Sequence, residues 1–212
     1  TYIHTVTESL KLAMADRQAY YGDPDFASIP IEGLLSKKYA AHRAALIDPK
    51  KAYPEIPPAG DPWQDSKGIS SNPSTNDSAC QSGDRLSGNE KDTTHIAAID
   101  QDGNMVCATP SGGPLQSSVF FPELGCTLSV RMEMFNFEEN HPNVLVPGKR
   151  PRTTLVNYIV CEKGQPLMTV GCPGGDMQAQ ASLQLILNTL VFGMNPQEAV
   201  EAPRFGTLSV AN

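Results

Sequence analysis

The sequence has little positive charge and no long hydrophobic run. Among its 212 residues, 16 are Lys or Arg and 23 are Asp or Glu, so the net charge is -7. Nucleic-acid binding needs clustered Lys and Arg side chains that neutralise phosphates, and the basic residues here are scattered. We therefore expect no nucleic-acid partner. No apolar run reaches the roughly 18 residues of a membrane-spanning helix, so we also expect no membrane span in this chain.

Cysteine and histidine are scarce, and their spacing argues against a metal site or a disulfide framework. An odd number of cysteines cannot all pair, and none stands at C-x-x-C spacing. The histidines form no H-x-x-x-H pair. We expect no metal or other cofactor, and reduced, mostly buried thiols. The residues concerned are Cys80, Cys107, Cys126, Cys161, Cys172, His4, His42, His95 and His141.

The amino-terminal part is predicted to form two helices and a linker. Apolar residues at helical spacing from residue 3 to residue 14 predict a helix that ends at Gly22 and Pro24. A second helix is predicted from Ser36, as its N-cap, to Ile47. Residues 57–92 are rich in Pro, Gly, Ser, Asn and Asp. Because such a segment buries too little apolar surface to offset its ordering entropy, we predict a mobile linker.

The rest of the chain changes to strand patterns and then to helices. Two hairpins are predicted, with turns at Asp102-Gly103 and Lys163-Gly164. The apolar stretch 181–194 predicts a buried helix, and Asn195-Pro196 opens a shorter one. Because strands and helices occur in separate blocks, the sequence predicts an α+β fold with antiparallel sheet layers.

Thr93 stands where the polar linker changes into the first strand. A threonine there is usually explained by β-propensity. Its position permits a second interpretation, because a threonine hydroxyl becomes a nucleophile when a base lies beside it. The free α-amine of a chain that begins with threonine, with a pKa of about 8, is such a base. Cleavage of the Asp92-Thr93 bond in the flexible segment would create it.

Several motifs around Thr93 resemble one known family. The stretches TTHIAAIDQDGNMVCAT, PGKRPRTTL, VGCPGGDMQ and FGMNPQEAVEAPRF follow one another as in the γ-glutamyltransferase (γ-glutamyltranspeptidase) family of N-terminal nucleophile hydrolases. The upstream ESLKLAMADRQAYYGDPDF is also similar to that family. The motifs TPSGG and KRPRTT resemble those of a divergent, acylase-like branch of this family.

The resemblance implies a precursor that cuts itself before Thr93 and forms an αββα sandwich. Residues 1–56 would be the helical end of the large-subunit region, 57–92 the linker, and 93–212 the small-subunit catalytic region. The two products would remain together as a heterodimer. Family members are longer at both ends, so we expect this chain to be an internal piece that lacks parts of both subunits.

The resemblance also assigns roles to individual residues. Ser111 takes the place of the hydroxyl that assists the nucleophile, although turn chemistry alone explains a serine there. Gly174 and Gly175 take the place of the family's oxyanion-hole pair. The alternative interpretation of these two glycines is an ordinary strand-to-helix turn. Thr153 and Thr154 replace paired serines that hold the substrate carboxylate, and the exchange keeps a hydroxyl donor.

Four positions depart from the family pattern. Gly113 stands where an Asn is usual, which removes a side-chain amide. Arg131 stands where the family has a Gln or Glu, and Glu133 stands where it has an Asp. Met134 replaces a second Asp, which pairs with the substrate's α-ammonium in the family. Loss of that carboxylate removes a charge-assisted hydrogen bond worth about 1.5 to 3 kcal/mol, unless Glu133 substitutes. Arg131 would repel the ammonium.

The leading functional hypothesis is a self-processing threonine amidohydrolase or acyltransferase. It would cleave γ-glutamyl amide bonds, as in glutathione-like substrates, and pass the acyl group to water or an amine. The alternatives are a glutaryl or cephalosporin-type acylase, an unprocessed non-catalytic homologue, and a hydrolase with Cys172 as nucleophile. Lys149 and Arg150 are candidates for steering an anionic substrate, or else belong to a solvated loop.

Overall fold

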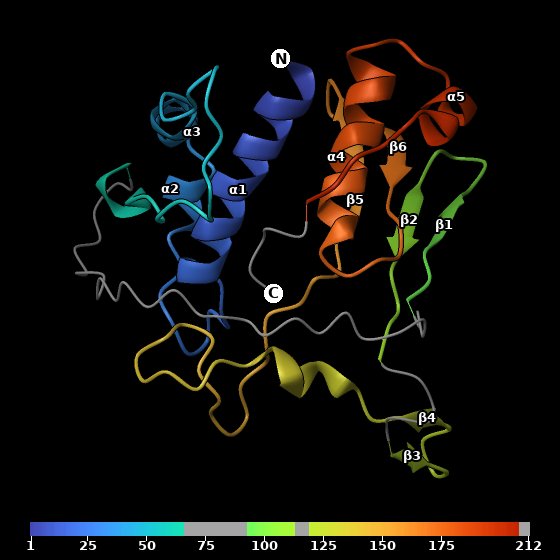
Figure 1. Ribbon diagram of the computed structural model, residues 1–212. Coiled ribbons are helices and arrows are strands. Elements are labelled where there is room, and N and C mark those ends of the chain that lie inside the picture. Colours follow the sequence, from blue (N-terminus) through green and yellow to red (C-terminus); the bar gives the residue numbers. More distant parts are fainter. Residues whose placement is uncertain (66–92, 113–118, 208–212) are drawn as a thin grey trace. The chain divides into compact units, whose positions relative to one another are not determined.

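The computed structural model describes residues 1–65, 93–112 and 119–207, which form helices and short antiparallel strands (Figure 1). The described residues fall into two compact units. The first comprises those within Thr1–Asp84 and Met134–Arg152 together with Thr207, and the second those within Arg85–Glu133 and Thr153–Gly206. None of the helices in the described ranges has the length and apolar character needed to span a bilayer.

The longest helix of the first unit is α1 (Tyr2–Tyr20), as the apolar spacing predicts. Its side chains Val6, Leu10 and Met14 recur at helical spacing and are buried. The helix ends before Gly22, where a Cβ atom would lie 2.2 Å from the carbonyl oxygen of Pro142. Only glycine fits so close to a backbone carbonyl, so this residue also ties the end of α1 to the segment 134–152.

Three shorter helices complete this part of the first unit. They are α2 (Ile31–Leu34), α3 (Lys37–Ala44) and the 3₁₀ helix η1 (Pro62–Asp65). Ser36 caps α3 as predicted, because its side chain accepts a hydrogen bond of 3.0 Å from the Tyr39 backbone N–H. The helix α2 was not predicted, because a single turn is too short to show a periodic pattern.

The beginning of the predicted linker is folded. The Tyr20 hydroxyl donates to the Gly60 carbonyl at 2.6 Å, and the Gly60 N–H donates to Asp16 at 2.9 Å. Arg43 donates to the Pro58 carbonyl and pairs with Asp16. Burial raises the pKa of Tyr20 to about 12. Polar side chains of α1 and α3 thus fix a segment whose composition predicted mobility, while residues 66–92 of the linker lie outside the described residues.

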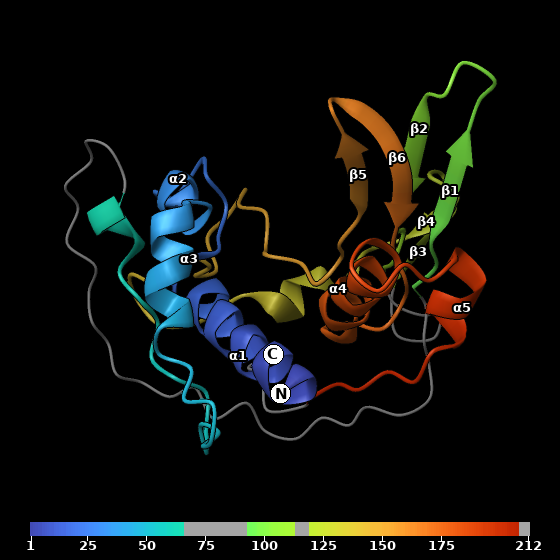
Figure 2. The same ribbon diagram turned by 90° about the horizontal axis from the view of Figure 1, so that it is seen from above.

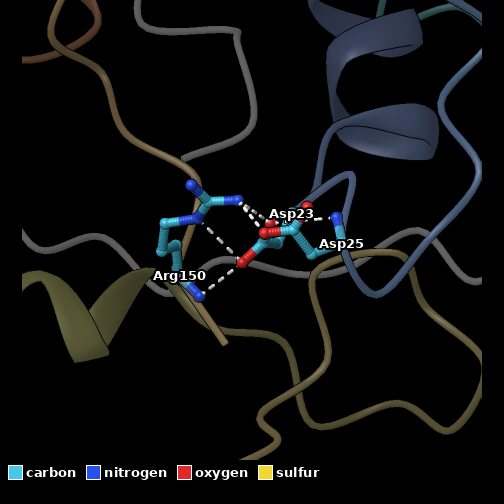
Figure 3. Close-up of polar contacts among 3 residues, drawn as sticks. All are labelled: Asp23, Asp25 and Arg150. Atoms are coloured by element: carbon cyan, nitrogen blue, oxygen red, sulfur yellow. Dashed lines mark hydrogen bonds and ion pairs between the residues drawn. The ribbon is translucent and has the colours of Figure 1, made fainter. Parts of the chain in front are cut away.

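Arg150 joins its own segment to the turn after α1 (Figure 3). Its backbone N–H and Nε donate to Asp23 Oδ2 at 2.9 and 3.0 Å, and its Nη2 lies 2.6 Å from an Asp25 carboxylate oxygen. The Asp23 side chain is almost fully buried, and Lys149 lies over the ring of Phe26. Arg150 is exposed but paired with Asp23 and Asp25, and Lys149 is buried against Phe26, so neither cation is free to steer an anionic substrate.

We predict that Asp23→Asn lowers the stability of the full-length protein at pH 7 and weakens its acid sensitivity. The hydrogen bonds from Arg150 hold the pKa of Asp23 well below its usual range. A lowered pKa contributes stability above the unfolded value of about 3.9, and that stability is lost as the pH falls further. The free energy of unfolding, measured in denaturant at pH 7 and pH 3, checks this. The exposed Asp25→Asn is the matched control and should change both values less.

Two hairpins of the second unit confirm the predicted strands. β1 (Ile96–Ile99) pairs with β2 (Met105–Ala108), and β5 (Tyr158–Glu162) pairs with β6 (Gln165–Val170), all antiparallel. Gly103, Lys163 and Gly164 have positive φ angles at the predicted turns. A third hairpin, β3 (Phe120–Phe121) with β4 (Cys126–Thr127), was not predicted because two-residue strands leave no alternation to detect.

The second unit also contains α4 (Met177–Leu190) and α5 (Pro196–Glu201). β2 lies beside β6, and α4 packs against β6 and α5 (Figure 1, Figure 2). α5 begins with the predicted Asn195 cap, completed by Glu198 as a capping box. The described strands form three two-stranded antiparallel sheets, so the mixed helix-and-sheet class is as predicted.

The prediction of a helix buried through its apolar side chains was wrong for α4. Its buried residues are polar. By contrast, the apolar residue Leu190 at its end is exposed, as are Val191 and Phe192, which follow it. Some of these buried amides donate to the backbone: Gln184 donates to the Phe205 carbonyl at 2.7 Å, and Asn188 donates to the Ala199 carbonyl at 3.4 Å. The buried set consists of Gln178, Gln180, Ser182, Gln184 and Asn188.

Candidate active site

Thr93 and Ser111 lie opposite each other at the open end of the β1–β2 hairpin. The pairing of the strands continues beyond the last ladder pair, because the Thr94 N–H donates to the Pro110 carbonyl at 3.1 Å. This register brings residue 93 next to residue 111. The Thr93 hydroxyl donates to Ser111 Oγ at 3.0 Å, and both residues are half-buried. The structure therefore brings together the two hydroxyls that the sequence singled out.

Arg131 joins this pair from the 3₁₀ helix η2 (Val130–Met134). The Val130 N–H donates to the Gly112 carbonyl at 2.9 Å, which holds the start of η2 against the segment that carries Ser111. The Arg131 guanidinium then donates from Nη2 to Ser111 Oγ. Ser111 Oγ thus accepts from both the candidate nucleophile and a permanent cation.

A second polar network lies two residues beyond Thr93. His95 Nδ1 lies 3.0 Å from Thr109 Oγ1, and the Thr109 hydroxyl donates to Asn157 Oδ1. Because the Thr109 proton is used toward Asn157, the imidazole donates through Nδ1, which assigns its tautomer. Thr109 is buried, so this chain of bonds fixes the start of β1 relative to β5. Sequence reasoning missed the network, although His95 follows Thr93 and Thr94 directly.

The same imidazole packs on the end of β6. A Cβ atom placed on Gly171 would lie 2.2 Å from His95 Cε1, so the ring occupies the space that a side chain there would need. Gly174 and Gly175 follow three and four residues later and have φ angles of 128° and 54°. These are values that glycine tolerates best. Their carbonyls accept from the N–H groups of Met177 and Gln178 at 2.9 and 3.1 Å, so the glycine pair leads directly into α4.

The remaining predicted residues have different surroundings. Thr153 is exposed and its Oγ1 accepts from the Leu155 N–H at 3.1 Å, whereas Thr154 is buried. Glu133 is exposed on η2. No contact joins these three side chains to Thr93 among the described residues. The predicted positions Gly113 and Asp92 lie outside the described residues.

The cysteines do not match the expectation of buried thiols. Of the four described, Cys126 and Cys161 are exposed, and Cys107 and Cys172 are half-buried; all four are free. Cys172 Sγ lies 3.7 Å from the Gln178 carbonyl and 3.9 Å from Ser182 Oγ, with no imidazole in contact across the described part of the chain. This environment offers no base for a thiol nucleophile. Within the same ranges, His, Cys, Asp and Glu form no cluster of metal-binding size.

The chain belongs to the γ-glutamyltranspeptidase family. The family model described as Gamma-glutamyltranspeptidase matches residues 1–211. The sequence is 33% identical over 216 residues to a glutathione hydrolase proenzyme of Pseudomonas sp. strain A14, covering 96% of this chain and 33% of that protein. It is 32% identical over 209 residues to the acylase ACY 1 proenzyme of Pseudomonas sp. strain SE83, covering 97% and 32%.

The solved structures agree. The crystal structure of cephalosporin acylase from Bacillus halodurans superimposes with a TM-score of 0.73 and 32% identity, and the match covers 95% of this chain and 32% of that one. The chain spans about a third of the length of the curated relatives it matches. Hydrolysis of glutathione and acylase activity are thus the activities named for proteins similar to this chain.

Proposed function

We propose that this chain is part of a self-processing threonine amidohydrolase or acyltransferase. The observation that carries the proposal is the 3.0 Å contact between the Thr93 and Ser111 hydroxyls at the junction predicted for cleavage. Family membership and relatives named as proenzymes support a precursor that is cut. In this proposal the cut falls between Asp92 and Thr93, and the α-amine of Thr93 becomes free.

The chemistry follows from the two groups that Thr93 then carries. Its α-amine, with an ordinary pKa of about 8, removes the hydroxyl proton while the oxygen attacks an amide carbonyl. Backbone N–H groups at Gly174 and Gly175 stabilise the developing oxyanion. The protonated amine returns the proton to the leaving nitrogen, and an acyl ester of Thr93 remains. Water or an acceptor amine resolves this ester and restores the hydroxyl.

The finer architecture belongs to the same proposal. An αββα sandwich is expected, with residues 1–56 in the large-subunit region, 57–92 as the linker and 93–212 in the small-subunit catalytic region. The two products would form a heterodimer. The antiparallel hairpins and the packing of α4 on β6 fit one half of such a sandwich.

The acyl donors are short acyl amides with a carboxylate at the far end. Names of glutathione hydrolases among the relatives support γ-glutamyl amides, with Thr153 and Thr154 as donors to the carboxylate. Glutaryl amides are the second candidate, favoured by Met134 and Arg131 where the family pattern has an ammonium-binding Asp and a neutral or acidic residue. Both candidate substrates would be attacked by the same nucleophile. They differ because only the γ-glutamyl group carries an α-ammonium.

Trapping the acyl-enzyme tests the proposal. The full-length protein is mixed with γ-glutamyl or glutaryl p-nitroanilide and quenched within the first turnovers, and its mass is measured. We expect the fragment that begins with Thr93 to gain the mass of one acyl group, released again by hydroxylamine. Turnover without an adduct on this fragment, or an adduct on Cys172, would contradict the mechanism.

A further inference from the structure

Arg131 is placed next to the nucleophile by two independent constraints. The hydrogen bond between Val130 and Gly112 fixes η2, and the Arg131 guanidinium bonds to Ser111 Oγ, which itself lies 3.0 Å from Thr93 Oγ1. The guanidinium is thus separated from the nucleophilic oxygen by a single side-chain hydroxyl. A short acyl chain attached to the Thr93 oxygen spans a similar distance, so its far end can reach the guanidinium.

The positive charge of Arg131 is not neutralised within the described part of the chain. None of the ion pairs found there includes Arg131, and its guanidinium bonds only to the neutral Ser111 hydroxyl. The buried Nε has no acceptor among the described residues. A buried donor without an acceptor is costly, and a planar guanidinium matches a carboxylate with two parallel N–H groups. The site therefore offers an unused donor to an anion.

The nearest acidic residue on the same helix points elsewhere. A 3₁₀ helix has about three residues per turn, so side chains two positions apart leave the helix in different directions. Glu133 is exposed, whereas Arg131 is half-buried. Glu133 therefore remains in solvent, where screening is strong, and the charge in contact with Ser111 is that of Arg131.

We propose that Arg131 determines substrate specificity: it binds the distal carboxylate of a dicarboxylic acyl group and disfavours acyl groups with an α-ammonium beside that carboxylate. This rests on the proposed function, because it needs Thr93 as the nucleophile. Glutaryl-type amides are then preferred to γ-glutamyl amides. The ammonium of a γ-glutamyl group meets Arg131 instead of an acid, and Met134 offers no compensating charge.

The experiment compares kcat/KM for glutaryl and γ-glutamyl p-nitroanilide in the processed full-length protein. The wild type should prefer the glutaryl substrate. Arg131→Gln keeps a donor to Ser111 but removes the charge, so it should lower kcat/KM for the glutaryl substrate roughly 10- to 100-fold, mainly through KM. The γ-glutamyl value should stay or rise. Glutarate should inhibit the wild type better than L-glutamate, and Arg131→Gln should remove that difference.

Lys163→Asn is the matched control, because it also removes one positive charge but lies at the exposed β5–β6 turn, where Asn tolerates the positive φ. It should leave the substrate ratio unchanged. An equal loss for both substrates in Arg131→Gln, or a wild-type preference for γ-glutamyl amides, would overturn the specificity proposal alone. Absence of cleavage before Thr93, together with no turnover of either anilide, would overturn the proposed function and this inference with it.

Discussion

Thr93→Ala should leave the full-length protein as one uncut chain with amide hydrolysis at the uncatalysed background. The substitution removes the oxygen that attacks both the Asp92-Thr93 bond and the substrate carbonyl. It also removes a donor to Ser111, which lies at a half-buried position, so we expect little change in folding. Intact mass and anilide turnover measure the two losses separately.

Thr94→Ala is the control for this prediction. Thr94 is the next residue, is exposed, and contacts Pro110 through its backbone rather than through its hydroxyl. It should process normally and keep most of its activity. Thr93→Ser, which retains a hydroxyl, should be cut, although more slowly. If Thr93→Ala were still cut at the same bond, another nucleophile would have to drive processing.

Gly171→Ala should have the second largest effect. The added Cβ would lie 2.2 Å from His95 Cε1 and 2.4 Å from Nδ1, so the imidazole must leave Thr109. Overpacking of this kind costs about 1 to 3 kcal/mol. Because His95 holds the start of β1, Thr93 shifts with it, and misplacement of a reacting group can lower the rate up to about 100-fold. Denaturant unfolding and kcat report the two effects.

A double-mutant cycle separates this clash from other effects of Gly171→Ala. His95→Ala removes the ring that the new Cβ would meet. In the His95→Ala background, Gly171→Ala should lower the free energy of unfolding by less than about 1 kcal/mol, because the added Cβ no longer meets the imidazole. The same penalty with and without His95 would show that the imidazole does not fill this space and does not position Thr93.

The parts of the fold that the sequence predicted are those governed by local chemistry. Ser36 and Asn195 mark the starts of α3 and α5 because their side chains cap the first turn. Gly103 and Gly164 mark turns that need positive φ. The hydrogen bonds that hold residues 58 and 60, and the burial of the polar face of α4, were not predicted, because they depend on residues distant in sequence, which composition does not show.

The candidate site was predicted in the same uneven way. Thr93 and Ser111 were predicted as site residues from the sequence motifs that contain them. The register of the β1–β2 hairpin explains why these two residues, 18 positions apart, are in contact. Arg131 was recognised as a departure from the family pattern, but its bond to Ser111 depends on how η2 packs, which no local pattern encodes. The links from His95 to Thr109 and Gly171 were missed for the same reason.

Amino-terminal sequencing of the purified full-length protein tests the central claim most directly, since all the proposed chemistry needs a free α-amine on Thr93. We predict two fragments, of which the smaller begins Thr-Thr-His-Ile, the order found at residues 93–96. A single chain in a protein that nevertheless hydrolyses acyl amides, or a fragment that begins at another residue, would contradict the account.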